Sequence, residues 1–93
     1  MKLWLDDVRP EPPGWTRAHS VAEAIAYLSA GEVTCASLDH DLGDHEADGG
    51  DGINVVDWMA EHGVWPVDGV TVHSANPVGR DRMLATIRRY SPY

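Results

Sequence analysis

The sequence predicts an α/β domain built on a parallel β-sheet. Short apolar runs alternate along the chain with segments of helical periodicity, an order typical of parallel strands joined by right-handed crossovers. Three of these runs end abruptly in polar side chains, as buried strands do where their carboxyl ends open into a site. The chain has 93 residues, of which 43% are hydrophobic and 24% charged, and this indicates one globular domain over residues 1–93.

Each element of the α/β pattern has a local signal. Apolar runs predict strands at residues 2–5, 15–19, 33–38 and 69–72. Apolar residues three and four positions apart predict helices at residues 20–30, 53–62 and 77–90. Ser20 and Glu23 have the spacing of a capping box at the start of the first helix, and Gly31 ends that helix. Between the first two strands, residues 9–14 contain three prolines, which exclude a helix there.

Composition restricts the partners and the location of the protein. The formal net charge of −8 excludes a protein that coats nucleic acid with a broad basic face, so no extended nucleic-acid-binding face is expected. No apolar stretch approaches the roughly 20 residues that span a bilayer, and the N-terminal apolar segment is too short for a signal peptide, so no membrane partner is expected. The single cysteine, Cys35, cannot form an intramolecular disulfide, which favours a reducing, cytoplasmic location.

The acidic residues after two of the predicted strands indicate a cation site. Asp6 and Asp7 follow the first strand, and Asp39 and Asp41 follow the third. Because parallel strands end at the same edge of a sheet, we expect these carboxylates to meet in one crevice. Mg²⁺ prefers such oxygen ligands and often shares its site with a phosphate, so the four carboxylates are predicted to bind Mg²⁺, with Mn²⁺ as an alternative. The first pair could instead only cap the turn after its strand.

Two histidines beside these carboxylates are candidate catalytic residues. His40 lies between Asp39 and Asp41, and His73 follows the fourth strand. Because histidine titrates near neutral pH, one ring could activate water while the other protonates a departing oxygen, with Asp39 as the third catalytic residue. The alternatives are a solvated loop residue for His40 and a hydrogen-bonded structural residue for His73.

Further polar residues near the same strand ends are candidate ligands for a phosphate. Ser74 and Asn76, together with N–H groups at the start of the last helix, could hold its oxygens. Arg9 or Arg80 could bind them bidentately. The pair Asn76-Pro77 has a simpler interpretation as the N-cap and first residue of the helix.

Two other features are interpreted as structural. The segment Asp44–Gly52 resembles only the first half of a calcium-binding loop, and we interpret it as a lid beside the crevice. The tryptophans are interpreted as packing residues of the core or its rim, and not as platforms for nucleobases; they are Trp4, Trp15, Trp58 and Trp65.

Three motifs occur in a fixed order along the chain. They are LDDVRPEP at residues 5–12, LDHDLG at residues 38–43 and HSANPVG at residues 73–79. Together they resemble the receiver domains of two-component signalling and, more closely, a divergent branch, the cyclic-phosphate processing receiver domains. This resemblance implies a three-layer flavodoxin/receiver-like fold with a four-stranded parallel sheet of order 2-1-3-4, lacking the first helix and the fifth strand.

The resemblance and the residues together predict a function. We expect a metal-dependent phosphoesterase that processes a cyclic phosphate, with a phosphate-containing small molecule, such as a cyclic nucleotide, or an RNA 2′,3′-cyclic phosphate end as its partner. The alternative is a stand-alone receiver-like signalling or binding module in which Asp39 accepts a phosphoryl group. Receivers carry an essential lysine on their fifth strand, whereas Lys2 is the one lysine of this chain, and this weighs against the alternative.

Overall fold

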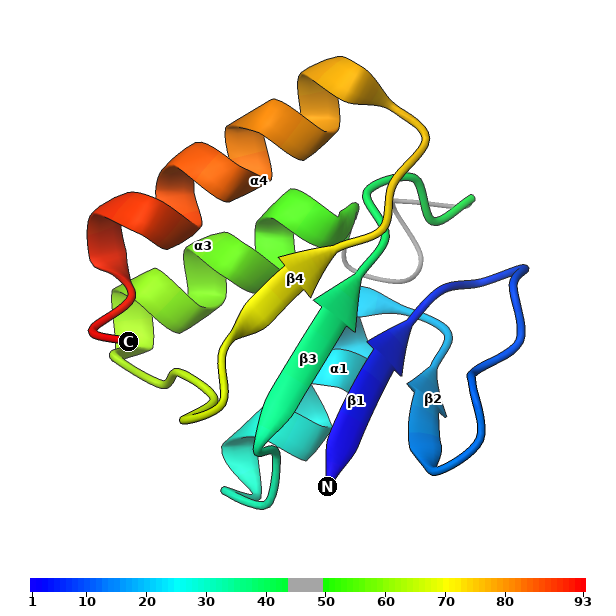
Figure 1. Cartoon of the computed structure of the whole chain (residues 1–93), viewed down its shortest axis with the longest axis horizontal. Helices are drawn as coiled ribbons and strands as arrows, with labels where there is room; N and C mark the ends of the chain where they lie inside the picture. Colours follow the sequence, from blue (N-terminus) through cyan, green and yellow to red (C-terminus); the bar gives the residue numbers. More distant parts are fainter. Residues whose placement is uncertain (44–49) are drawn as a thin grey trace.

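A parallel four-stranded sheet forms the centre of the computed structural model, which describes residues 1–43 and 50–93 (Figure 1). The strands are β1 (Lys2–Leu5), β2 (Trp15–Ala18), β3 (Cys35–Leu38) and β4 (Val70–Val72). Their order across the sheet is β2-β1-β3-β4, and each neighbouring pair is parallel. The predicted sheet and its strand order are therefore confirmed.

Three helices occur among the described residues in the predicted order, with the predicted N-caps Ser20 and Asn76 on the first and last, whereas Ala30, and not the predicted Gly31, is the C-cap of the first. The helices are α1 (Val21–Ser29), α3 (Gly52–His62) and α4 (Pro77–Tyr90). At the start of α1, Ser20 Oγ accepts a hydrogen bond from the Glu23 N–H over 3.2 Å. Gly63, whose φ of 65° suits glycine, ends α3. No helix in the described part of the chain is long and apolar enough to cross a membrane.

All three of these helices lie on one side of the sheet. The crossovers from β2 to β3 through α1 and from β3 to β4 through α3 run in the same direction, so their right-handedness places both helices on one face. Accordingly α1 packs against α3 and α3 against α4, and the strands pass in front of α1 and α3 in Figure 1. The connection from β1 to β2 runs the opposite way, and its prolines exclude the helix that would cover the other face. The described residues therefore form two layers, one fewer than the three-layer fold that the resemblance implied.

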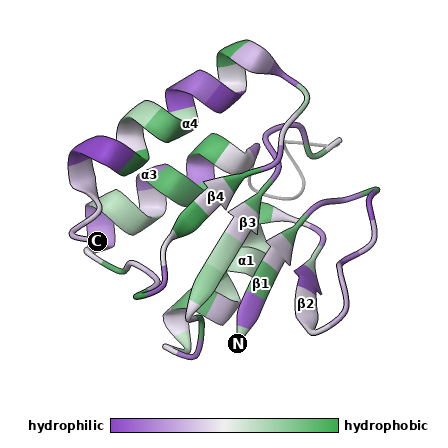
Figure 2. Cartoon of the chain, in the orientation of Figure 1, coloured by the Kyte–Doolittle hydropathy of each residue, from purple (hydrophilic) through white to green (hydrophobic). Residues whose placement is uncertain are grey.

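The hydrophobic core lies between the sheet and this single helical layer. Side chains alternate along each strand, so every second residue points toward the helices. On β1 and β3 these residues are at most 2% exposed; they are Leu3, Leu5, Ala36 and Leu38. Met59 of α3 and Met83 of α4 complete the core from the helical side. Figure 2 shows apolar residues, in green, along β3 and β4, and bands of polar residues, in purple, along α4.

Candidate metal and phosphate site

Three carboxylates gather where β1 and β3 end. Asp6, Asp7 and Asp39 each place one oxygen within 4.8 Å of the others. Asp6 is 1% exposed and Asp39 is 7% exposed, so both charges are largely removed from water. Gly43 lies beside them with φ of 74°, and a Cβ atom there would stand 2.9 Å from Asp7 Oδ2. The turn after β3 is thus shaped so that its backbone can approach the acidic cluster.

Asp6 is the most heavily hydrogen-bonded member of this cluster. Its Oδ1 accepts the N–H groups of Val8 and Arg9 over 2.9 and 2.7 Å, and its Oδ2 lies 3.1 Å from His73 Nε2. Burial alone would raise the pKa of this carboxyl group, but the two backbone donors and His73 outweigh that effect and lower the pKa. Asp6 is therefore an ionised acceptor at neutral pH.

Asp39 is in the opposite electrostatic situation. Burial raises its pKa, and the negative charge of Asp6 raises it further. The hydrogen bond from the His40 N–H to Asp39 Oδ1, over 2.8 Å, only partly offsets these effects. A cation between the carboxylates would remove this repulsion, and three hard oxygen donors are the ligand type that Mg²⁺ or Mn²⁺ takes.

His73 is held on three sides. Ser37 Oγ lies 2.7 Å from its Nδ1, and Asp6 lies on the Nε2 side. The ring also stacks on Trp4 with a centroid distance of 3.8 Å and an interplanar angle of 4°. Since ionised Asp6 can only accept, Nε2 carries the proton in the neutral ring and the Ser37 hydroxyl donates to Nδ1. His73 therefore fixes the orientation of Asp6, as outer-shell histidines and carboxylates do around metal sites.

Arg9 connects the ends of β1 and β4. Its guanidinium donates to the His73 carbonyl over 2.8 Å, and its Nε lies 3.9 Å from Asp6 Oδ2. The side chain is still 48% exposed. Arg9 therefore lies at the rim of the acidic cluster, and it is there that we expect it to bind a phosphate.

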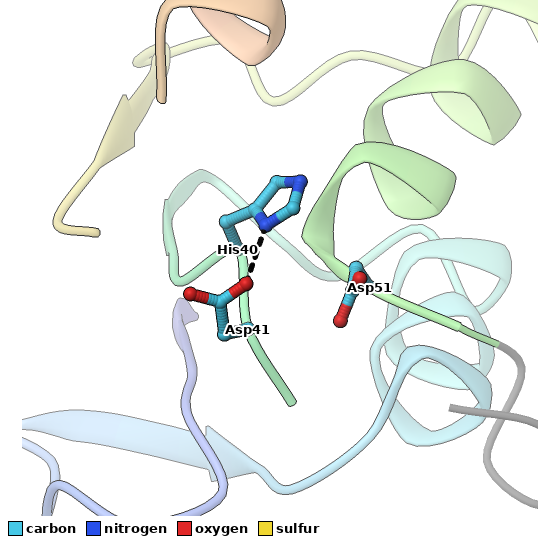
Figure 3. Close-up of side chains that lie close together, drawn as sticks. All are labelled: His40, Asp41 and Asp51. Carbon is cyan, nitrogen blue, oxygen red and sulfur yellow. Dashed lines mark hydrogen bonds and ion pairs between the residues drawn. The ribbon is translucent and has the colours of Figure 1, made fainter. Parts of the chain in front are cut away.

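A second polar group stands beside the carboxylate cluster. His40, Asp41 and Asp51 bring one ligand atom each within 4.8 Å of one another, and His40 Nδ1 lies 2.8 Å from Asp41 Oδ1 (Figure 3). Asp41 was predicted to join the first cluster; the structure groups it with His40 and Asp51 instead, since its Oδ1 bonds the His40 ring. Gly79 leaves room for the ring, since a Cβ there would stand 2.5 Å from His40 Cδ2.

The remaining predicted phosphate ligands have structural tasks in this conformation. Ser74 Oγ accepts the Asn76 N–H over 3.0 Å, and Asn76 Oδ1 accepts the Gly79 N–H over 3.1 Å, which is the N-cap interpretation. Asn76 Nδ2 also reaches Asp41 Oδ1 at 3.4 Å. Arg80 is exposed on the first turn of α4. The predicted lid, Asp44–Gly52, falls mostly on residues 44–49, which lie outside the described residues.

Sequence reasoning missed several residues that support this site. Ser37 and Trp4 hold His73, and Asp51 belongs to the second polar group. A signal for the first two existed, because each lies two positions before a site aspartate and so points to the same face of its strand. Asp51 gave no such signal, because it is the N-cap of α3 and lies near His40 and Asp41 only in the folded chain.

The parallel sheet of order 2-1-3-4, with carboxylates at the ends of β1 and β3, defines a receiver-like domain. A family model described as the cyclic-phosphate processing receiver domain matches residues 1–89. The chain therefore belongs to the family of cyclic-phosphate processing receiver domains. Searches among curated proteins and among solved structures gave no match.

Proposed function

We propose that this domain is a metal-dependent phosphoesterase that opens a cyclic phosphate by hydrolysis. The observation that carries the proposal is that a histidine–aspartate pair, His40 and Asp41, directly follows Asp39, whose carboxylate lies together with those of Asp6 and Asp7. One group supplies a base and the other a cation site, the two requirements of phosphoester hydrolysis near neutral pH. The family name supports the cyclic phosphate as the substrate class.

The carboxylate cluster fits a divalent cation by its donor chemistry. Its three ligands are hard oxygens, and burial together with the negative charge of Asp6 raises the pKa of Asp39, an effect that a bound cation would oppose. Asp6, Asp7 and Asp39 would hold Mg²⁺ or Mn²⁺, and the bound ion would neutralise the charge of the phosphate and polarise its P–O bonds. His73 would keep Asp6 in the orientation that the site needs.

His40 is the better placed of the two histidines for proton transfer. Asp41 accepts at Nδ1, so the neutral ring presents its lone pair at Nε2, which makes no hydrogen bond with residues 1–43 or 50–93. Figure 3 shows this nitrogen on the side of the ring away from Asp41. His40 would take a proton from the attacking water. The new P–O bond forms as one ring ester bond breaks, and the departing ribose oxygen takes a proton from solvent.

The non-bridging oxygens of the substrate would lie toward Arg9. Its guanidinium is half exposed at the rim of the cluster and already spans the ends of β1 and β4. Arg80, exposed on the first turn of α4, is the second candidate cation for the same anion. Each would stabilise negative charge that develops on phosphorus during attack.

A receiver-type function remains as the second candidate, because Asp39 stands at the end of β3 where receivers accept a phosphoryl group. Against this function, the lysine that receivers use has no equivalent at this edge: Lys2 begins β1, at the opposite end of the strand from Asp6. Its ammonium lies 5.8 Å from the centroid of the Trp15 ring. The two histidines beside Asp39 also have no task in phosphoryl acceptance.

The test is an assay of the purified domain with Mg²⁺ or Mn²⁺ against 2′,3′-cyclic mononucleotides, 3′,5′-cyclic nucleotides and RNA ends that carry a 2′,3′-cyclic phosphate. We expect a ring-opened monophosphate from at least one of them, and no product with chelator. His40→Ala should lower turnover roughly 10²–10⁴-fold, the range for loss of general base catalysis. His62→Ala is the matched control, since His62 lies on α3 and contacts Trp58. No product from any cyclic phosphate would refute the proposal.

A further inference from the structure

The second face of the sheet carries no helix in the described part of the chain. All described helices pack on the other face, and the loop after β1 runs outside β2 in Figure 1. In a parallel sheet a bare face is unusual, because crossover helices normally cover both sides. The side chains on this face must therefore either replace a helical layer or bind something else.

The strand register shows which residues form this open face. Paired residues of parallel neighbours point to the same side, so the face is formed by the residues that alternate with the core. Its members on the four strands are Lys2, Trp4, Trp15, Arg17, Cys35, Ser37 and Thr71. Among these only Ser37 is buried, and it lies against His73. None of the strand residues on this face is acidic.

Aromatic rings run across the open face toward the site. Trp15 meets Trp4 edge to face at a centroid distance of 6.0 Å, and Trp4 stacks on His73 at 3.8 Å. The Trp4 ring is anchored by a hydrogen bond from its Nε1 to the Arg9 carbonyl over 3.1 Å. Both tryptophans are half-buried, so each keeps ring surface in contact with solvent. The row ends at Asp6, the innermost carboxylate of the cluster.

The charge of this face is opposite to that of the whole chain. The chain has a formal net charge of −8, yet the three cations among residues 1–79 are all on or beside the open face. Lys2 lies over the Trp15 ring, Arg17 donates from Nε to the Asp6 carbonyl over 3.0 Å, and Arg9 donates to the His73 carbonyl. A surface that combines aromatic rings with cations in an acidic protein is complementary to a polyanion that carries flat bases.

We propose that the open face binds the single-stranded RNA segment that precedes a 2′,3′-cyclic phosphate. This inference rests on the proposed function and selects an RNA end over a small cyclic nucleotide as the substrate. Bases would stack on the Trp15–Trp4 row, which replaces the packing role that the sequence favoured for these two rings, and Lys2 and Arg17 would neutralise backbone phosphates. RNA is favoured over DNA because a 2′,3′-cyclic phosphate requires a 2′-hydroxyl group. The strands are only three or four residues long, so the face is short and accommodates a few nucleotides.

Binding can be measured without turnover. The probe is a short 5′-labelled oligouridylate with a free 3′-hydroxyl group, titrated with the whole domain in chelator at low salt and followed by fluorescence anisotropy. We expect Trp15→Ala to weaken binding roughly tenfold, within the range for the loss of one stacked base. Lys2→Glu should weaken it and flatten the dependence on salt. Lys2 is exposed, so this second variant does not threaten the fold, and Arg82→Ala on α4 is the matched control with no expected effect.

The outcomes separate this inference from the proposed function. If a mononucleotide 2′,3′-cyclic phosphate is hydrolysed but the oligouridylate does not bind, or binds equally well to the Trp15 and Lys2 variants, the open face is not an RNA surface and the catalytic proposal stands. If the oligouridylate binds through this face but no cyclic phosphate is hydrolysed, the catalytic proposal falls instead. Self-association of the free protein that Trp15→Ala abolishes, measured by sedimentation, would assign the face to a second copy of the chain and overturn the inference.

Discussion

Asp39→Asn should make the metal-free domain more stable and at the same time remove its response to Mg²⁺. The Asp6 and Asp39 oxygens lie within 4.8 Å, where two unit charges repel by about 3.5 kcal/mol at an effective dielectric constant of ~20. The substitution removes this repulsion but weakens the hydrogen bond from the His40 N–H, so we expect a net gain of about 1–2 kcal/mol. For a domain of this size that gain raises Tm by roughly 5–15 °C.

The same substitution should cancel stabilisation by the cation. At a Mg²⁺ concentration about 100 times its dissociation constant, wild type should gain about 2.7 kcal/mol, whereas Asp39→Asn should gain almost nothing. Thermal melts followed by circular dichroism, with Mg²⁺ or chelator, measure both effects. Asp57→Asn, an exposed carboxylate on α3, is the control that should behave as wild type. A metal-free Asp39→Asn protein that melts below wild type, or a wild type whose Tm ignores Mg²⁺, would refute the electrostatic account of the cluster.

Three further predictions follow from the same contacts. The pKa of Asp39 is raised above its ordinary 3.8, so metal-free wild type should lose stability relative to Asp39→Asn as the pH rises from below 3.8 through the raised pKa. Thermal melts in chelator should therefore show equal stability of the two proteins at the acid end and a growing difference above it. Gly79→Ala should lower turnover because the new methyl group displaces the His40 ring, whereas Mg²⁺ should still raise Tm because the carboxylates are unchanged. Alanine itself favours the helix, so unchanged turnover would show that the position of the ring does not matter. His73→Ala should lower turnover and also weaken the Mg²⁺ response, unlike His40→Ala, because Asp6 loses its partner; equal responses to Mg²⁺ in the two variants would contradict the positioning role.

Much of the fold could be predicted because its signals are local. The helix at Pro77–Tyr90 has the predicted bounds, since an asparagine N-cap and a proline at the first helical position both depend only on neighbouring residues. The second strand ends one residue earlier than predicted, at Ala18, because the His19 N–H donates to the Glu23 carboxylate at the start of α1. The layer count could not be predicted from local signals alone, because it depends on the direction of each crossover.

The candidate site was predictable in its carboxylates and less so in its histidines. Asp6 and Asp39 each follow a buried strand, and because Leu5 of β1 pairs with Leu38 of β3, the two carboxylates come to lie side by side. His73 follows β4, whereas its hydrogen-bond partners are Ser37 of β3 and Asp6, which follows β1, 36 and 67 residues away, and such contacts leave no periodic signal. The grouping of Asp41 with His40 depends on the path of the turn after β3, which propensity does not specify.

The most direct test of the proposed function is single-turnover hydrolysis of an RNA 2′,3′-cyclic phosphate end in ¹⁸O-labelled water with Mg²⁺. The account predicts that wild type gives a ring-opened phosphate that carries one solvent oxygen, and that His40→Ala and Asp39→Asn form this product much more slowly. The contradictory result is an intact cyclic phosphate with wild-type protein, together with stable modification of Asp39 by acetyl phosphate, since that pair of observations would assign the site to phosphoryl acceptance.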